Sequence, residues 1–160
     1  MRRILFAFVF CVTAAMAMAQ ASRVFMTMPD SLCPFFSPQQ RITLLRLAQV
    51  GATDSVDNLF SGKSVITSLS DTRLTLSVAD GVEYLLALKA DTILLVNTVC
   101  APVCSSVVRS YVANWLPLGT VPPPAGMAFP QADFAADGTL VWTDRTPQLL
   151  DEEEKKHYRP

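Results

Sequence analysis

The sequence predicts an α+β domain: an antiparallel meander of five to six strands, with one N-terminal amphipathic helix packed on it and a final C-terminal strand. Residues 38–50 have helical periodicity between strong capping signals. Residues 54–118 switch to an apolar period of two, interrupted only by short turns. Links this short join antiparallel neighbours, because a parallel crossover needs a dozen or more residues.

The N-terminus has the pattern of a cleaved secretory signal peptide. Arg2 and Arg3 precede an uncharged apolar run, Ile4 to Met16, whose length of about 13 residues is too short to cross a membrane core that needs roughly 20. Ala17-Met18-Ala19 then supplies the small residues that signal peptidase reads, so we expect cleavage before Gln20. The expected organisation is a signal peptide at 1–19, a single domain at 20–146 and a charged tail or short helix at 147–160.

Export and charge limit the partners that the protein can have. A cleaved signal peptide places the protein in the periplasm or at the outer surface, with no membrane span left. The chain has 13 basic and 14 acidic residues, and the basic ones are scattered along it. Because nucleic-acid-binding proteins concentrate positive charge on one face, we expect no nucleic-acid partner.

The one predicted helix has clear signals at both of its ends. Residues 20–36, before it, are expected to be extended or irregular. Ser37 is placed as the N-cap, with Pro38 at the first helical position and Gln40 in register to complete a capping box. Gly51 supplies a left-handed stop. The apolar residues between these signals form one stripe, so the helix should pack on another layer.

The predicted strands are rich in Val, Ile, Leu and Thr, and short polar or Gly-containing turns separate them. They lie near residues 55–60, 64–70, 73–78, 83–89, 92–99 and 105–112. Apolar and polar residues alternate over 73–78, as in a strand with one face toward water. Ile93 to Val96 is apolar on both faces, so this strand should lie centrally with a layer over it.

The C-terminal part is less regular. The meander is expected to end at Trp115 to Leu118, and residues 130–136 are expected to form a short helix before Gly138. Thr139 to Thr143 is predicted as a strand that returns to the sheet. A ligand or partner surface is assigned to Trp115, Pro122, Pro123, Pro124 and Trp142. For the aromatic residues, the alternative is packing against the sheet.

Cys100 and Cys104 are the strongest candidates for chemistry. Three residues at a hairpin end separate them, which brings their α-carbons to roughly the 4.4–6.8 Å that a disulfide tolerates. In an oxidising compartment we expect a disulfide that fixes the register of the turn. Cys33 is the odd cysteine and is expected to be buried rather than nucleophilic, because no histidine lies near it in the sequence.

Two alternatives remain open for this cysteine pair. In a thiol–disulfide redox protein one sulfur would be an activated thiolate, although such enzymes commonly place two residues between the cysteines, at a helix N-terminus. In a soft-metal carrier, copper(I) would bind to Cys100 and Cys104 together with the thioethers of Met26 and Met28. The sequence has no calcium-loop register, phosphate-binding loop or zinc-protease pattern, and we expect no cofactor.

Two motifs resemble a known family. They are Phe25 to Leu32, which reads FMTMPDSL, and Asn97 to Pro102, which reads NTVCAP. Both are similar to segments of a Bacteroidales family of uncharacterised exported proteins, domain of unknown function family 3256. The resemblance spans most of the chain after the signal and implies a Gram-negative periplasmic or outer-surface setting. It implies no activity.

Taken together, the residues favour a non-enzymatic binding or structural module of the bacterial envelope, whose partner is a protein, peptide or glycan. No cluster of catalytic polar residues is evident, and the single histidine, His157, lies in the charged tail. The alternative is a thiol–disulfide redox protein or copper carrier that uses the cysteine pair.

Overall fold

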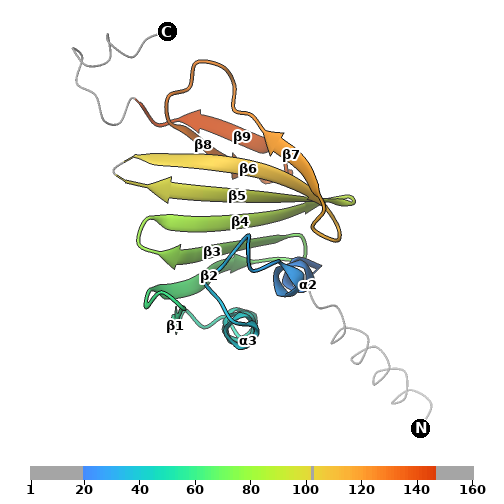
Figure 1. Ribbon diagram of the computed structural model, residues 1–160, viewed down its shortest axis with the longest axis vertical. Helices are drawn as coiled ribbons and strands as arrows, with labels where there is room; N and C mark the ends of the chain where they lie inside the picture. The colour runs from blue at the N-terminus through green and yellow to red at the C-terminus, as the bar shows by residue number, and fades with distance from the viewer. Residues whose placement is uncertain (1–19, 102, 147–160) are drawn as a thin grey trace, which may run out of the picture.

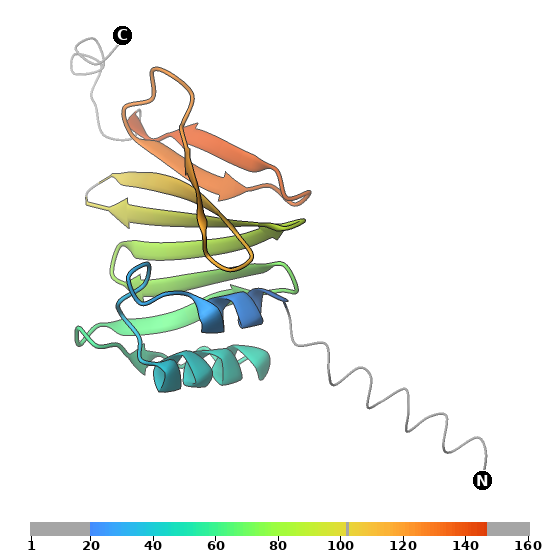
Figure 2. The same ribbon diagram turned by 45° about the vertical axis from the view of Figure 1, so that its right-hand side comes forward.

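The computed structural model describes residues 20–101 and 103–146. Seven strands form one antiparallel sheet in which each strand pairs with the next along the chain (Figure 1). Two helices lie against one face of this sheet, and a separate two-stranded hairpin packs on the other (Figure 2). The predicted signal peptide and C-terminal tail lie outside the described residues.

The antiparallel meander is confirmed, but it has seven strands rather than five or six. The helices are α2 (Gln20–Thr27) and α3 (Pro38–Gln49). The strands of the large sheet are β1 (Val56–Asp57), β2 (Lys63–Leu69), β3 (Arg73–Ala79), β4 (Val82–Lys89), β5 (Thr92–Cys100), β6 (Cys104–Val112) and β7 (Pro117–Val121). The hairpin consists of β8 (Pro130–Phe134) and β9 (Leu140–Asp144). None of the described helices is long and apolar enough to span a membrane.

The predicted helix is confirmed as α3, together with both of its end signals. The Gln40 backbone N–H donates to Ser37 Oγ at 3.3 Å, and the Ser37 N–H donates to Gln40 Oε1 at 2.8 Å, which completes the capping box. Gly51 follows the helix with a φ of 70°, the left-handed geometry that ends it. Leu44 and Leu45 are buried in the core between the helices and the sheet.

The expectation of irregular structure over residues 20–36 is wrong for its first part, which forms helix α2. Ala21, Phe25 and Met28 are buried in one cluster. Ala21 and Phe25 are four residues apart and so share one face of α2, and Met28, just beyond the end of the helix, continues the same spacing. Burial of that face outweighs the preference of Val24 and Phe25 for extended backbone.

Strand β5 is central, as predicted, and it is covered on both faces. Ile93 and Leu95 belong to the core on the helix side, whereas Val96 belongs to the core under the hairpin. The alternation predicted for residues 73–78 is also confirmed, because Leu74, Leu76 and Val78 are buried while the residues between them are partly exposed.

Three expectations for the C-terminal part are corrected. The meander does not end at Leu118, because Pro117–Val121 pairs with β6 as strand β7. Residues 130–136 are not helical: Pro130–Phe134 is strand β8, whose alternate residues Ala132 and Phe134 are buried against the sheet. The predicted last strand exists as β9, but it pairs with β8 rather than with the sheet.

Candidate functional site

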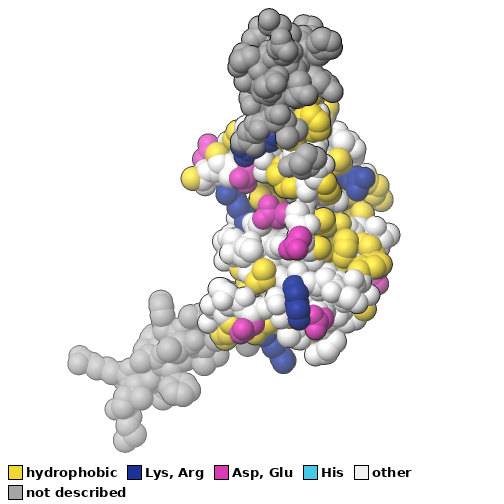
Figure 3. Space-filling model, turned by 90° about the vertical axis from the view of Figure 1, so that its left-hand side faces the viewer, with side chains coloured by type: hydrophobic (Ala, Val, Ile, Leu, Met, Phe, Trp, Pro, Cys, Tyr) yellow, Lys and Arg dark blue, Asp and Glu magenta, His cyan; other side chains and the backbone are white. Residues whose placement is uncertain are grey.

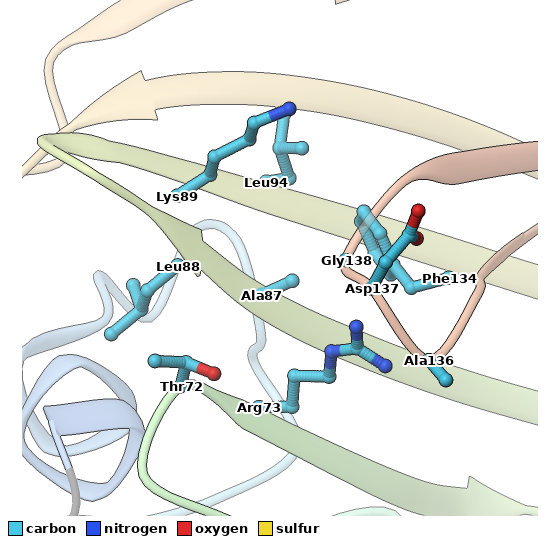
Figure 4. Close-up of a pocket in the computed structure, with 10 residues that line it drawn as sticks. All are labelled: Thr72, Arg73, Ala87, Leu88, Lys89, Leu94, Phe134, Ala136, Asp137 and Gly138. Atoms are coloured by element: carbon cyan, nitrogen blue, oxygen red, sulfur yellow. The ribbon is translucent and has the colours of Figure 1, made fainter.

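A pocket of about 210 Å³ opens where the start of β3 and the end of β4 face the turn between β8 and β9 (Figure 4). Its charged side chains are Arg73, Lys89 and Asp137, and its apolar ones include Ala87, Leu94 and Phe134. Alternate residues of neighbouring strands share one face of a sheet, so both cations belong to the face that the hairpin covers. The pocket therefore lies between this face of the sheet and the β8–β9 turn.

Arg73 is held in place by the hairpin. Its Nη2 donates to the backbone oxygen of Ala135 at 2.6 Å, and its guanidinium carbon lies 5.7 Å from the centre of the Phe134 ring, a cation–π geometry. A guanidinium has five N–H donors, and the described residues of the chain engage only one of its nitrogens. The others are available to a ligand.

Lys89 and Asp137 complete the charged lining. Neither Lys89 nor Arg73 forms an ion pair within 4.0 Å among the described residues. Asp137 lies on the hairpin turn, where its Oδ1 accepts from the Thr139 N–H at 2.9 Å. Hydrogen bonds from Thr139, and to a lesser degree the charge of Arg73, lower the pKa of Asp137, so it is ionised at neutral pH. The two cations outweigh it, and the pocket suits a small anionic group.

A second, smaller depression of about 130 Å³ lies further along the same face of β4. Glu83 and Asp133 are its carboxylates, and Thr98 and Gln131 also line it. Burial raises the pKa of Glu83, and the negative charge of Asp133 raises it further. The hairpin thus covers a sheet face that is cationic at one end and acidic at the other.

The cysteine pair lies at the turn between β5 and β6. The sulfurs of Cys100 and Cys104 are 2.04 Å apart, at bonding distance. Their α-carbons are 3.8 Å apart, which is closer than the expected range, and the two residues are directly opposite in the strand register. The Cys100 N–H donates to Gly81 O at 2.7 Å, and a Cβ at Gly81 would lie 2.7 Å from Cys100 O. Only glycine fits at this contact.

The predicted aromatic and proline surface is brought together only in part. Trp115 is buried in the helix-side core, where its ring packs edge-on against Tyr111 at 5.4 Å and its Nε1 donates to Thr27 Oγ1 at 3.3 Å. It is a core residue, and its assignment to a ligand surface is wrong. Trp142 is partly buried against the hairpin-side core, while Pro122, Pro123 and Pro124 are exposed in the loop between β7 and β8.

The soft-metal alternative lacks its predicted geometry. Met26 is next to Thr27, which lies beside Trp115, just beyond the end of β6. Cys104 is the first residue of β6, and a strand of nine residues spans about 30 Å. Met26 and the cysteine pair therefore lie at opposite ends of the sheet. Across residues 20–101 and 103–146, no three His, Cys, Asp or Glu side chains group where a metal could bind.

The structure also reveals a buried arginine that the sequence pattern does not single out. Arg41 is only 3% exposed, and its guanidinium donates to the backbone oxygens of Phe25, Met28 and Cys33 and to Asp30 Oδ1 at 2.8 Å. The first motif, FMTMPDSL, is therefore the segment that wraps this cation. Arg41 lies three and four residues before Leu44 and Leu45, so it is on the buried face of α3, and only its charge suggests an exposed position.

An exposed apolar patch lies at the end of the sheet that carries the β3–β4 and β5–β6 turns. Figure 3 views this end and shows hydrophobic side chains gathered on one side of it. Phe60 is 65% exposed and packs on Phe35, whose ring centre lies 6.0 Å from that of Tyr84. Val99 and Val107 are also exposed.

Comparison with known proteins identifies a family but no activity. No curated protein matches the chain. Its fold is similar to that of a solved domain of an uncharacterized protein from Porphyromonas gingivalis W83, with a TM-score of 0.68 and 20% identity over 86% of this chain and 88% of that one. A family model described as "Protein of unknown function (DUF3256)" matches residues 13–123, which is more than half of the chain. The chain therefore belongs to this family, as its two motifs predict.

Proposed function

We propose that the chain is an exported, non-enzymatic binding module of the bacterial envelope, and that it holds a carboxylate of a protein or peptide partner in the pocket of Arg73 and Lys89. The observation that carries the proposal is the pair of cations from adjacent strands over an apolar floor. A volume of about 210 Å³ accepts a carboxylate with a short apolar stem. It is small for a larger ligand, which needs roughly 300 Å³ or more.

The state of Cys33 supports a binding role over a catalytic one. This thiol is buried, and burial raises its pKa to about 11, so it is protonated at neutral pH and a poor nucleophile. The candidate base of a cysteine hydrolase, His157, lies outside the described residues. The signal-peptide pattern and the cysteine pair at bonding distance support an oxidising location outside the cytoplasm.

The test is an NMR titration of the protein, followed through backbone amides of β3, β4 and the β8–β9 turn. N-acetyl-alanine, which has a carboxylate, should shift these amides, whereas N-acetyl-alanine amide should not. Lys89→Gln should weaken binding roughly three- to tenfold, as expected for the loss of one partly exposed charge contact. A peptide with an internal glutamate and a blocked C-terminus distinguishes a side-chain carboxylate from a chain end.

Lys63→Gln is the matched control, because Lys63 is an exposed lysine that pairs with Asp57 at the β1–β2 edge of the sheet and does not line the pocket. It should leave carboxylate binding unchanged. Equal shifts from the carboxylate and the amide, or equal binding by the two lysine variants, would overturn the proposal.

We also propose that Cys100 and Cys104 are bridged in the exported protein and fix the β5–β6 turn. Alkylation of native protein without reductant should leave both sulfurs unlabelled, and Cys100→Ser should lower stability. A bridge across so short a loop removes little unfolded-state entropy, so the loss should be small, about 2 kcal/mol or less. A pair that is reduced on isolation, with one sulfur alkylated rapidly, would favour the redox alternative.

A further inference from the structure

The start of helix α2 is anchored to the turn between β2 and β3. The backbone nitrogen of Gln20 donates to Asp71 Oδ1 at 3.2 Å, and the backbone nitrogen of Ala21 donates to the Asp71 backbone oxygen at 2.9 Å. One residue of the turn thus satisfies the first two N–H groups of the helix, which lack partners within it. The Gln20 nitrogen is held against a carboxylate.

The residues that directly follow this contact are buried. Gln20 is exposed, whereas Ala21 and Ser22 are fully buried and Phe25 packs edge-on against Phe36 at 6.3 Å. Within the described residues, Ala21 is thus the first buried position. A chain that begins at Gln20 keeps all of these buried contacts.

The predicted cleavage site is the peptide bond that precedes Gln20. Hydrolysis of that bond turns the Gln20 nitrogen from a neutral amide into an α-ammonium group. A positive charge at a helix N-terminus opposes the helix dipole and is unfavourable by itself. The Asp71 carboxylate at 3.2 Å offsets this, because it turns a neutral hydrogen bond into a charge-assisted one.

We propose that Gln20 is the first residue of the exported protein and that its α-ammonium group forms an ion pair with Asp71, which docks α2 on the β2–β3 turn. The inference rests on the export that is part of the proposed function. Arg23, from the same helix, and Asp91, from the β4–β5 turn, are charged residues that line one surface depression together with Gln20.

The ion pair has a chemical consequence for the glutamine itself. An N-terminal glutamine cyclises when its unprotonated α-amine attacks its own side-chain amide carbon: a C–N bond forms, ammonia leaves, and the product is a lactam without the ammonium charge. The carboxylate of Asp71 favours the protonated amine, which has no lone pair for this attack. We therefore expect the exported protein to keep an open-chain glutamine.

The first experiment is intact-mass and N-terminal analysis of protein expressed with its own N-terminus. A mature chain that starts at uncyclised Gln20 is the expected result. Cleavage at another bond overturns this inference and leaves export intact, whereas full-length protein in the cytoplasm overturns export itself.

The second experiment titrates the α-amine by NMR in protein that starts at Gln20. Asp71→Asn keeps the hydrogen-bond acceptor and removes only the charge, so it should lower the amine pKa by roughly half a unit, the size of an exposed ion pair. The same variant should cyclise several-fold faster. Asp54→Asn, at an exposed position in the loop between α3 and β1, is the control and should change neither quantity. An amine that titrates identically in Asp71→Asn and the parent protein overturns the ion pair.

Discussion

The two faces of the sheet are built differently. The helix side holds the larger core, in which the aromatic rings of Phe25, Phe36, Tyr111 and Trp115 pack around aliphatic side chains of the sheet. Its one buried charge, among the described residues, is Arg41, which is bonded to three backbone oxygens and a carboxylate.

The hairpin side has a small core and more polar contacts. Its buried residues are Ala87, Val96, Val108, Ala132 and Phe134. Thr98 and Ser106 share a hydrogen bond at 2.8 Å beside this core, and both described depressions under the hairpin have charged linings. Since apolar burial supplies most of the stability of a fold, we expect the helix side to contribute more of it, while the hairpin side carries the pocket with two cations.

The sharpest test of this difference compares a phenylalanine from each face. Phe36→Ala should lower the free energy of unfolding by about 3–5 kcal/mol, the usual cost of truncating a fully buried phenylalanine. Phe134→Ala should cost less, about 1–3 kcal/mol, because Phe134 belongs to the smaller core and lines a pocket. Urea denaturation followed by tryptophan fluorescence measures both.

The two tryptophans report on the two faces separately. Trp142→Phe leaves Trp115 as a probe of the helix side, and Trp115→Phe leaves Trp142 as a probe of the hairpin side. In the Phe134→Ala background, the hairpin probe should change at lower urea than the helix-side probe. Coincident transitions would mean that both faces unfold as one unit.

The second prediction concerns the buried guanidinium of the helix side. Arg41→Ala should lower the free energy of unfolding by about 3 kcal/mol, because it leaves several buried carbonyl oxygens without a donor and each costs about 1–3 kcal/mol. Arg46→Ala, on the same helix but exposed, should change stability by less than about 0.5 kcal/mol. Similar losses of unfolding free energy in the two variants would show that the buried guanidinium of Arg41 stabilises the fold no more than an exposed arginine does.

The third prediction concerns the polar link between the sheet and the hairpin. Ser106 Oγ accepts from the Ala132 N–H at 3.0 Å, so Ser106→Ala leaves a buried donor unpartnered and should cost about 1–2 kcal/mol. Hydrogen exchange should quicken at the Ala132 amide and not in α3. Ser105→Ala is the control, because the side chain of Ser105 is on the opposite face of β6. Faster exchange in α3 as well as at the Ala132 amide would argue against a local link.

The smallest expected effect is the pH dependence from Glu83. Burial, and then the charge of Asp133, raise its folded-state pKa above the ordinary 4.5, so the folded protein binds this proton more tightly than the unfolded chain does. Its contribution to stability is thus present at low pH and lost as the pH rises through the folded-state pKa. Glu83→Gln should raise the Tm slightly at pH 7, with the difference vanishing below pH 4.5. Asp133→Asn should act in the same direction but more weakly.

Local signals explain what the sequence predicts well. Ser37, Gln40 and Gly51 act within a few residues of their own positions, so the ends of α3 follow from them. The strands from β2 to β6 follow from an apolar period of two with short turns, because such turns permit only one pairing. The central place of β5 follows from its two apolar faces.

What the sequence does not predict depends on contacts between distant residues or on a competing local preference. The spacing of Ala21, Phe25 and Met28 contains the signal for α2, but Val24 and Phe25 obscure it with their preference for strands. Arg41 has the helical spacing of a core position, but its charge suggests the surface until residues 25–33 wrap it. Arg73 and Lys89 acquire a role only when the hairpin, more than 40 residues later in the chain, folds over them.

The exposed Pro122 to Pro124 segment has a consequence for how this scaffold can change. It joins β7 to a hairpin that contributes one wall of the pocket yet lies beyond residues 13–123, the part that matches the family model. Exchanging residues 125–146 for the hairpin of a relative would give a chimera with the same sheet and helices but a different turn over the pocket. Selectivity could then diverge, in nature or by engineering, while the seven strands and the wrapped arginine stay untouched.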